Sequence, residues 1–130
     1  MNPVVHFEMP AGDRQRMADF YSHAFGWKTR MLGEEMGNYV LATTGPTDES
    51  GRPTEPGSIN GGFYPIQEGM PPQYPSLVIG VGDIGQAIEK IIAAGGTVLG
   101  EPVEIPGTGL YVSFLDTEGN RNSLMQPYMG

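Results

Sequence analysis

The stretch of sequence that decides the fold is HFEMPAGDRQRMADFYSHAFGW, residues 6–27. A related stretch, SLVIGVGDIGQAIEKIIAAGGT, occupies residues 76–97. Each of the two reads as a strand, a turn that ends in Gly-Asp, an amphipathic helix and a glycine that stops the helix. An internal repeat of this kind predicts a chain that is built from two similar modules.

The first strand of each copy is expected to bury one of its faces. In the first copy, Phe7 and Met9 point one way while His6 and Glu8 point the other, because successive side chains of a strand alternate. In the second copy, the expected buried face is Leu77, Ile79 and Val81, and the opposite face is Ser76, Val78 and Gly80.

The helices of the two copies have matching start and stop signals. Asp13 and Asp83 stand where an N-cap is needed, because a carboxylate there accepts a hydrogen bond from the unpaired N–H groups of the first turn. Gly26 and the pair 95–96 supply the left-handed stop. The expected apolar stripes are Met17, Phe20, Tyr21, Ala24 and Phe25 in the first helix and Ile84, Ala87, Ile88, Ile91 and Ile92 in the second.

Three further strands are predicted after each helix, at 27–32, 37–43 and 58–65 and at 97–105, 109–115 and 121–127. Each module is therefore β-α-β-β-β. The predicted fold class is α+β, with two tandem βαβββ modules that form a curved mixed sheet, a half-open barrel, around a cleft and with the helices outside. We expect one domain over 1–130, with module one at about 1–66, a Pro- and Gly-rich linker at 67–75 and module two at 76–130.

Charge and composition exclude several classes of function. The formal net charge is −8, so phosphate backbones and anionic membranes repel the chain, and we expect neither a nucleic-acid nor a membrane partner. The absence of cysteine excludes disulfides, thiolate metal ligands and a cysteine nucleophile. No apolar run is long enough to span a bilayer, and residues 1–10 lack a signal-peptide pattern, so a cytoplasmic protein is expected.

The order and spacing of several short motifs resemble those of a known family, the vicinal oxygen chelate superfamily of glyoxalases, bleomycin-resistance proteins and extradiol dioxygenases. The resemblance runs from about residue 4 to residue 126. It implies the two-module fold described above and a homodimer. The motifs that carry it are Val5-His6-Phe7-Glu8, Gly12-Asp13, Ala18-Asp19-Phe20-Tyr21, Phe25-Gly26-Trp27, Val81-Gly82-Asp83, Ala94-Gly95-Gly96, Phe114-Leu115-Asp116, Glu118-Gly119-Asn120 and Leu124-Met125-Gln126.

The resemblance also bears on metal binding. Metal enzymes of the superfamily carry one ligand on each of four strands, two from each module, and His6 stands at the first of these positions. The other three positions hold Ser76, Ser123, and either Asn60 or Gly61. A divalent ion needs three or four nitrogen, oxygen or sulfur ligands in a fixed shell, which one imidazole beside hydroxyl groups does not supply. We therefore predict no metal site and no cofactor.

The expected binding site is centred on these same positions. His6 and Glu8 share one face of the first strand and are the candidate catalytic residues, because an imidazole can act as a base near neutral pH. Tyr39 and Tyr111 occupy matching places in the two modules. The expected ligand-binding residues are His6, Glu8, Tyr39, Asn60, Ser76, Tyr111, Ser123 and Met125.

Three functions remain open at this point. The first is a glyoxalase-like protein that binds a small organic molecule in the cleft without a metal, either as a binder or as a lyase or isomerase related to lactoylglutathione lyase. The second, which the charge of −8 favours, is a bleomycin-resistance-like module that sequesters a cationic drug or metabolite. The third is a metal-dependent lyase or dioxygenase with a displaced ligand set, in which Glu8, Glu101 or Glu104 would join His6.

Overall fold

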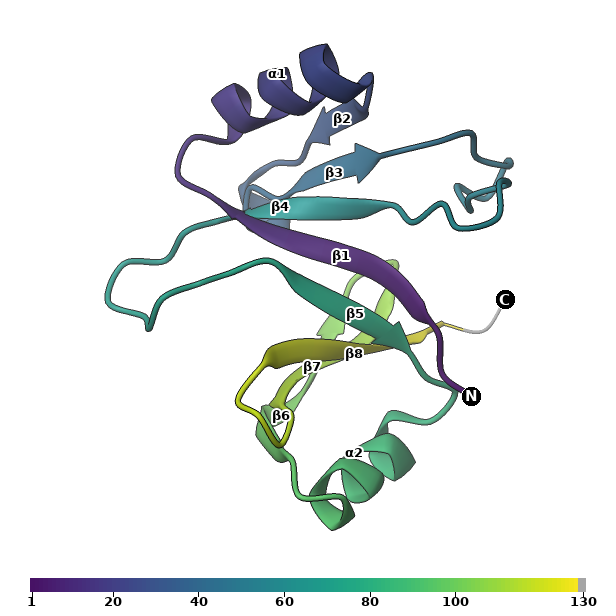
Figure 1. Cartoon of the computed structure of the whole chain (residues 1–130), viewed down its shortest axis with the longest axis vertical. Helices are drawn as coiled ribbons and strands as arrows, with labels where there is room; N and C mark the ends of the chain where they lie inside the picture. The colour runs from purple at the N-terminus through teal and green to yellow at the C-terminus, as the bar shows by residue number, and fades with distance from the viewer. Residues whose placement is uncertain (129–130) are drawn as a thin grey trace. The chain divides into compact units, whose positions relative to one another are not determined.

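The computed structural model describes residues 1–128. By their contacts these residues fall into two compact units. The N-terminal unit is His6–Pro75, and the C-terminal unit consists of Met1–Val5 together with the chain from Ser76 onward. Figure 1 shows that each unit has one helix and a set of strands of its own.

The N-terminal unit follows the order strand, helix, strand, strand, strand. Its elements are β1 (Val4–Ala11, whose first two residues belong to the C-terminal unit), α1 (Arg14–Phe25), β2 (Lys28–Met31), the 3₁₀ turn η1 (Glu34–Met36), β3 (Val40–Thr43) and β4 (Gly61–Pro65). The strands lie in the order β2-β3-β4-β1. β1 is parallel to β4, whereas β3 is antiparallel to both of its neighbours.

The C-terminal unit repeats this arrangement. Its elements are β5 (Ser76–Gly80), α2 (Ile84–Ala93), β6 (Thr97–Ile105), β7 (Gly109–Leu115) and β8 (Arg121–Pro127). The strands lie in the order β5-β8-β7-β6, with β5 parallel to β8 and the other pairs antiparallel. The predicted α+β class and the two βαβββ modules are therefore confirmed.

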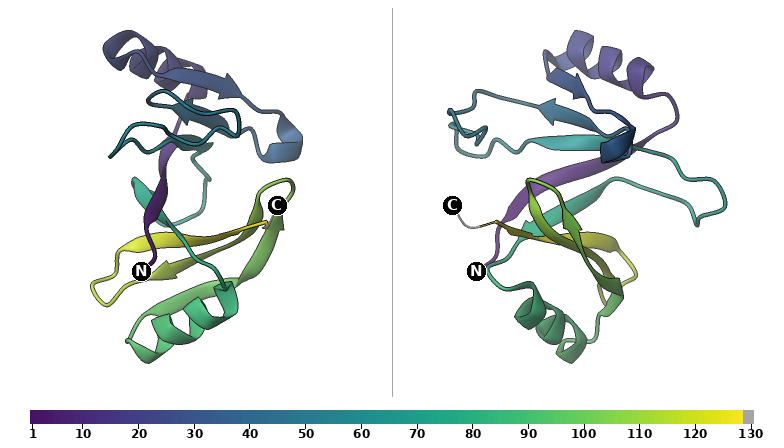
Figure 2. Two further views of the ribbon diagram at one scale, coloured as in Figure 1. Left: turned by 90° about the vertical axis from the view of Figure 1, so that its right-hand side faces the viewer. Right: turned by 180° about the vertical axis from the view of Figure 1, so that it is seen from behind.

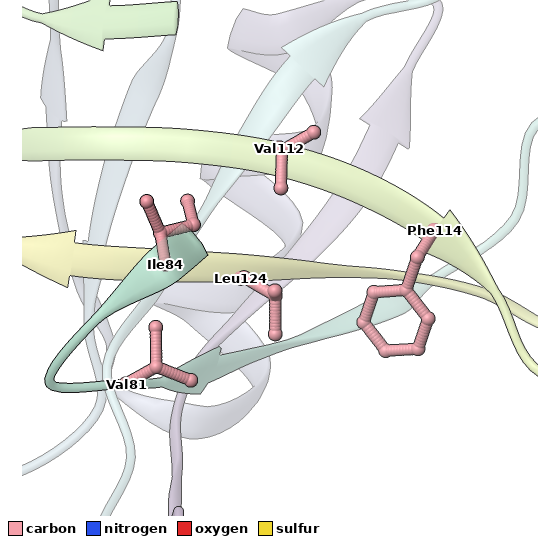
Figure 3. Close-up of a cluster of buried hydrophobic side chains, with 5 residues drawn as sticks. All are labelled: Val81, Ile84, Val112, Phe114 and Leu124. Carbon is pink, nitrogen blue, oxygen red and sulfur yellow. The ribbon is translucent and has the colours of Figure 1, made fainter. Parts of the chain in front are cut away.

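Each unit buries one face of its sheet under its own helix (Figure 2). In the N-terminal unit, Phe63 and Val40 are fully buried, and Met17 and Tyr21 of α1 pack against their cluster. The core of the C-terminal unit consists of Val81, Ile84, Val112, Phe114 and Leu124 (Figure 3). Phe7 and Met9 join the first cluster as the strand alternation predicts.

The predicted helix caps are confirmed in both units. The Asp13 carboxylate accepts a hydrogen bond from the Arg16 N–H at 3.0 Å, and Asp83 accepts one from Gln86 at 3.0 Å. Gly26 ends α1 with φ at 75°, a left-handed conformation that glycine adopts at low cost. Within the described part of the chain, neither helix is long and apolar enough to cross a membrane.

The apolar stripes of both helices are narrower than predicted. Phe20 and Phe25 of α1 are 58% and 65% exposed, with ring centroids 6.4 Å apart. The buried residue of α1 is Ala18, whose small side chain lets the helix lie close to the sheet while the flanking rings point outward. The other exposed members of the predicted stripes are Ala24 and Ile92.

The first strand of the C-terminal unit also departs from the simple alternation. Leu77 was expected in the core but is 46% exposed, whereas Val78 is only 2% exposed. Val78 is the register partner of the buried Ser123, so the face of β5 opposite α2 is packed as well. Alternation alone identifies one buried face and misses a strand that buries residues on both.

Two strands of the N-terminal unit begin later than predicted. The strand expected at 37–43 starts at Val40, because η1 ends in a turn where Gly37 and Asn38 both have positive φ, at 67° and 56°. The strand expected at 58–65 starts at Gly61, and the preceding residues belong to a loop. The remaining predicted strands match the observed ones to within about two residues.

Candidate functional site

The sheet face of the N-terminal unit that lies opposite α1 holds His6 and Glu8. Phe7 and Met9 pack toward the helix, so the two alternate residues of β1 point the other way. Glu8 pairs in register with Gly62 of β4, which places Gly62 on this same face. We call this surface, defined by His6, Glu8, Tyr39 and Gly62, the polar face of the N-terminal unit.

The register of β4 resolves the alternative between Asn60 and Gly61. Gly61 pairs with Phe7, and a Cβ on Gly61 would meet the Phe7 ring, so Gly61 faces the core. Asn60 lies beside β1, where its carbonyl accepts a hydrogen bond from the Phe7 N–H at 3.3 Å. Its side-chain oxygen accepts from the Thr44 N–H at 3.1 Å, and its amide donates to the Gly51 carbonyl at 3.4 Å. The Asn60 side chain therefore braces the loop between β3 and β4.

His6 forms a hydrogen bond with Tyr39 on the polar face. The distance from His6 Nε2 to the Tyr39 hydroxyl is 2.8 Å, and the two rings are 6.4 Å apart and nearly parallel at 18°. Burial lowers the pKa of His6 below its usual value of 6.5, and the charge of Glu8 acts against this by raising it. The imidazole is therefore mainly neutral near pH 7 and keeps one ring nitrogen without a hydrogen.

Tyr39 reaches His6 by crossing the backbone of Gly62. A Cβ built on Gly62 would overlap the Tyr39 ring and hydroxyl, so the ring lies directly against this glycine. Gly62 itself is buried. Gly62 was not predicted as a site residue, because a glycine has no side chain that could bind a ligand. A Gly-Gly pair inside a strand does, however, indicate that another group approaches the backbone closely.

The C-terminal unit has a buried cluster of hydroxyl groups on its corresponding face. Ser123 is 3% exposed, and its hydroxyl lies 2.7 Å from the Tyr111 hydroxyl and 3.0 Å from that of Ser113. Ser113 is 7% exposed and was not among the predicted residues. Hydroxyl groups both donate and accept, so both neighbours can bond to Ser123, and Ser113 also accepts from the Arg121 guanidinium at 3.5 Å.

The remaining two predicted residues of the C-terminal unit differ in placement. Met125 is the register partner of Tyr111 and shares its face. Ser76 is not beside Ser123, because the register of β5 and β8 puts Val78 there, and Ser76 lies two residues earlier, roughly 7 Å along the strand. Within this unit Ser76 and Ser123 are therefore not neighbours, and their shared role in one site stays a prediction.

A family model described as Glyoxalase/Bleomycin resistance protein/Dioxygenase superfamily matches residues 4–124. The chain belongs to this superfamily. Among curated relatives, it is 30% identical over 125 residues to a probable lactoylglutathione lyase of Vibrio cholerae, covering 95% of this chain and 89% of the relative. It is 31% identical over 124 residues to a glyoxylase-like domain-containing protein of Didymella fabae, covering 93% and 91%.

Solved structures with low sequence identity to this chain show the same fold. A hypothetical protein from Bacillus halodurans matches with a TM-score of 0.70 and 15% identity, covering 99% of this chain and 96% of the other. A methylmalonyl-CoA epimerase variant of Streptomyces coelicolor, in complex with 2-nitronate-propionyl-CoA, matches with a TM-score of 0.70 and 16% identity, covering 97% of each chain. These likenesses concern the fold alone.

The donor groups of this chain do not fit the metal centre that the superfamily's metal enzymes imply. His6 Nε2 is engaged with Tyr39, Gly62 offers no side chain, and the Ser123 hydroxyl lies between two other hydroxyls. Within residues 1–128, no three side chains of the His, Cys, Asp and Glu types gather closely enough to hold an ion. Neutral hydroxyl groups are poor substitutes for imidazole and carboxylate ligands.

The carboxylates considered as a displaced ligand set lie on different elements. Glu8 belongs to β1, whereas Glu101 and Glu104 lie exposed on β6. The Glu104 carboxylate accepts a hydrogen bond from the Tyr128 hydroxyl at 2.5 Å. Glu104 is therefore engaged with the strand end of its own unit.

Proposed function

We propose that this chain binds a small organic molecule at the polar face of the N-terminal unit and catalyses a lyase or isomerase reaction on it without a resident metal ion. The observation that carries the proposal is the His6–Tyr39 pair, with its 2.8 Å hydrogen bond between an imidazole and a phenol. Membership of the superfamily supports the proposal, as does a relative that is named as a probable lactoylglutathione lyase.

In the proposed reaction His6 acts as a general base. Burial keeps the imidazole mainly neutral, and a neutral imidazole takes a proton through the nitrogen that carries no hydrogen. The proton comes from a carbon next to a carbonyl group: the C–H bond breaks, an N–H bond forms, and the electron pair moves to the carbonyl oxygen. Glu8 stabilises the imidazolium that results, since its charge acts to raise the pKa of His6. Return of the proton to the same carbon, as the electron pair moves back from the oxygen and the carbonyl re-forms, completes an epimerisation. Where the first carbon carries a hydroxyl, return of the proton to the former carbonyl carbon, together with transfer of the hydroxyl proton to the former carbonyl oxygen, completes an isomerisation.

The test uses the intact chain, treated with a chelator, on two probes: the hemithioacetal of methylglyoxal with glutathione, and methylmalonyl-CoA. We expect turnover of at least one probe, and we expect His6→Gln to reduce kcat by about a hundredfold or more, as loss of a general base does. The matched control is His23→Gln. His23 is exposed on α1 with its Nδ1 at 2.8 Å from the Asp19 carbonyl, so this variant should keep full activity.

Two outcomes would overturn the proposal. Activity that appears only after zinc, nickel or iron is added, with stoichiometric metal in the active protein, would contradict the metal-free reaction. Turnover that survives His6→Gln would show that the base lies elsewhere. Both results are read from the same set of assays, with metal content measured on each sample.

A binding module without turnover is the second candidate. The observation that favours it is the formal net charge of −8, which attracts a cationic ligand. Calorimetric titration with a cationic glycopeptide antibiotic of the bleomycin type tests it. Tight binding that weakens at high salt, together with no turnover of either probe, would favour sequestration over catalysis.

A further inference from the structure

The position of Tyr39 depends on two features that are far apart in the sequence. The first is the turn before β3, where Gly37 and Asn38 have positive φ and where the Leu32 N–H donates to the Tyr39 carbonyl at 2.9 Å. This turn directs the Tyr39 side chain back across the sheet. The second is Gly62, whose missing side chain leaves the space that the ring fills.

The C-terminal unit offers an internal comparison for this arrangement. Glu8 pairs with Gly62 in β1 and β4, and the equivalent pair in β5 and β8 is Val78 with Ser123. Tyr111 takes the place of Tyr39, and it bonds to the Ser123 hydroxyl at 2.7 Å. Where the strand carries a side chain, the tyrosine bonds to that side chain.

We propose that Tyr39 is a positioning residue, which holds the imidazole of His6 in one orientation and one tautomer, and that Gly62 is the residue that makes this contact possible. The importance of this contact for turnover rests on the proposed function, whereas the contact itself does not. The Tyr39 hydroxyl can donate to Nε2 or accept from it, and the direction that this bond takes determines which ring nitrogen carries the hydrogen.

Because Tyr39 occupies Nε2, any group that is to use this nitrogen must displace the phenol. The nearly parallel packing of the two rings at 18° restricts the imidazole further. The titratable groups that act on His6 within its unit are Glu8 and Tyr39. Gly62 contributes by leaving the space in which the Tyr39 ring lies beside His6.

The experiment reads the imidazole directly by long-range ¹H–¹⁵N NMR. The chain has two histidines, so His23→Gln leaves a single imidazole to observe. In this background we compare Tyr39→Phe, which removes only the hydroxyl, with Gly62→Ala. The second variant keeps Tyr39 but places a methyl group in the space that its ring occupies. The matched control is Tyr21→Phe, because the Tyr21 hydroxyl lies on the helix side of the same sheet, 3.8 Å from the Met9 sulfur.

We expect the background protein to show one dominant tautomer of His6. Tyr39→Phe and Gly62→Ala should both change the tautomer ratio about fivefold, the factor that the loss of one net hydrogen bond produces. Tyr21→Phe should leave the ring-nitrogen signals where they are. A Gly62→Ala protein that fails to fold leaves the test to Tyr39→Phe, which keeps the ring and its packing.

Unchanged ring-nitrogen signals in Tyr39→Phe would overturn the proposal, even if that variant lost thermal stability. The outcome for the proposed function is separate. If the signals change as expected but the unsubstituted chain turns over no probe, the proposal that Tyr39 positions His6 is supported. The proposal that His6 is a catalytic base is then rejected. If turnover is found and the signals do not change, His6 acts without help from Tyr39.

Discussion

The two units place a tyrosine at the same point of a repeated module but give it different partners. Tyr39 lies over Gly62 and bonds to an imidazole on the first strand, whereas Tyr111 meets Ser123 on the last strand. The scaffold is the same in both units, down to the parallel pairing of first and last strands. The two units differ at two equivalent positions, Gly62 against Ser123 on the last strand and His6 against Ser76 on the first, and a titratable partner for the tyrosine is present in the N-terminal unit.

The two polar clusters therefore have different physical roles. In the C-terminal unit Ser113 and Ser123 are buried and hydrogen-bonded, which is the condition under which buried polar groups are tolerated. Ser123 bonds to the half-buried Tyr111, and Ser113 also accepts a hydrogen bond from the Arg121 guanidinium at 3.5 Å. The cluster of the N-terminal unit contains an imidazole whose pKa is lowered by burial, hydrogen-bonded to a phenol, and we assign chemistry to that unit for this reason.

The largest expected effect is on stability, and it compares the hydrophobic cores of the two units. Phe63 is fully buried, so Phe63→Ala should lower the free energy of unfolding by about 4 kcal/mol. The same type of substitution in the core of the C-terminal unit, Phe114→Ala, should lower the free energy of unfolding by about 3 kcal/mol, since Phe114 is 8% exposed. Urea unfolding measures both, and Phe20→Ala on the exposed side of α1 is the control. A Phe20→Ala loss as large as that of Phe63→Ala would contradict the assigned core.

The next effect concerns the hydroxyl cluster. Ser123→Ala should cost about 1–3 kcal/mol of unfolding free energy, because it leaves the buried hydroxyls of Tyr111 and Ser113 short of a partner. Ser50→Ala, in an exposed loop, is the matched control and should cost much less. If Ser123→Ala left the free energy of unfolding unchanged, other hydrogen-bond partners, such as water, would have to satisfy these hydroxyl groups.

The sequence was enough to predict the scaffold because its signals are local. The caps at Asp13 and Asp83 and the glycine stop at Gly26 depend only on neighbouring residues, and each was predicted correctly. Errors arose where burial depends on what covers an element. The exposure of Phe20 and the burial of Val78 are set by packing, which no periodicity encodes.

The candidate site was less predictable because it depends on register. Gly62 and Ser113 were missed, and the position on β4 was assigned to Asn60 or Gly61, since strand pairing shifts such assignments by one or two residues. The partner of Tyr39 could not be derived either, because it follows from a turn, a register and an absent side chain together. What the sequence did supply was His6 and its alternation with Phe7.

The smallest expected effect is a pH dependence that only the N-terminal unit should contribute near neutral pH. Burial lowers the pKa of His6 below 6.5, so the folded chain binds fewer protons at this site than the unfolded chain. The contribution of His6 to the free energy of unfolding is fully present above pH 6.5. It is lost as the pH falls below 6.5 toward the lower pKa that His6 has in the folded chain. The slope must stay below the roughly 1.4 kcal/mol per pH unit that one whole proton produces.

Urea unfolding at pH 7.5, 6.5 and 5.5 should therefore show a loss of stability on acidification that His6→Gln removes and His23→Gln retains. The C-terminal unit has a counterpart only at much lower pH. Hydrogen bonds from Asn120 and Glu118 hold the pKa of the exposed Asp116 below 3.8, so its contribution is present above that pH and is lost below it. If His6→Gln left the slope between pH 7.5 and 5.5 unchanged, the imidazole would not be a buried neutral base. The two units would then differ only in the hydrogen-bond partner of the tyrosine, which is His6 for Tyr39 and Ser123 for Tyr111.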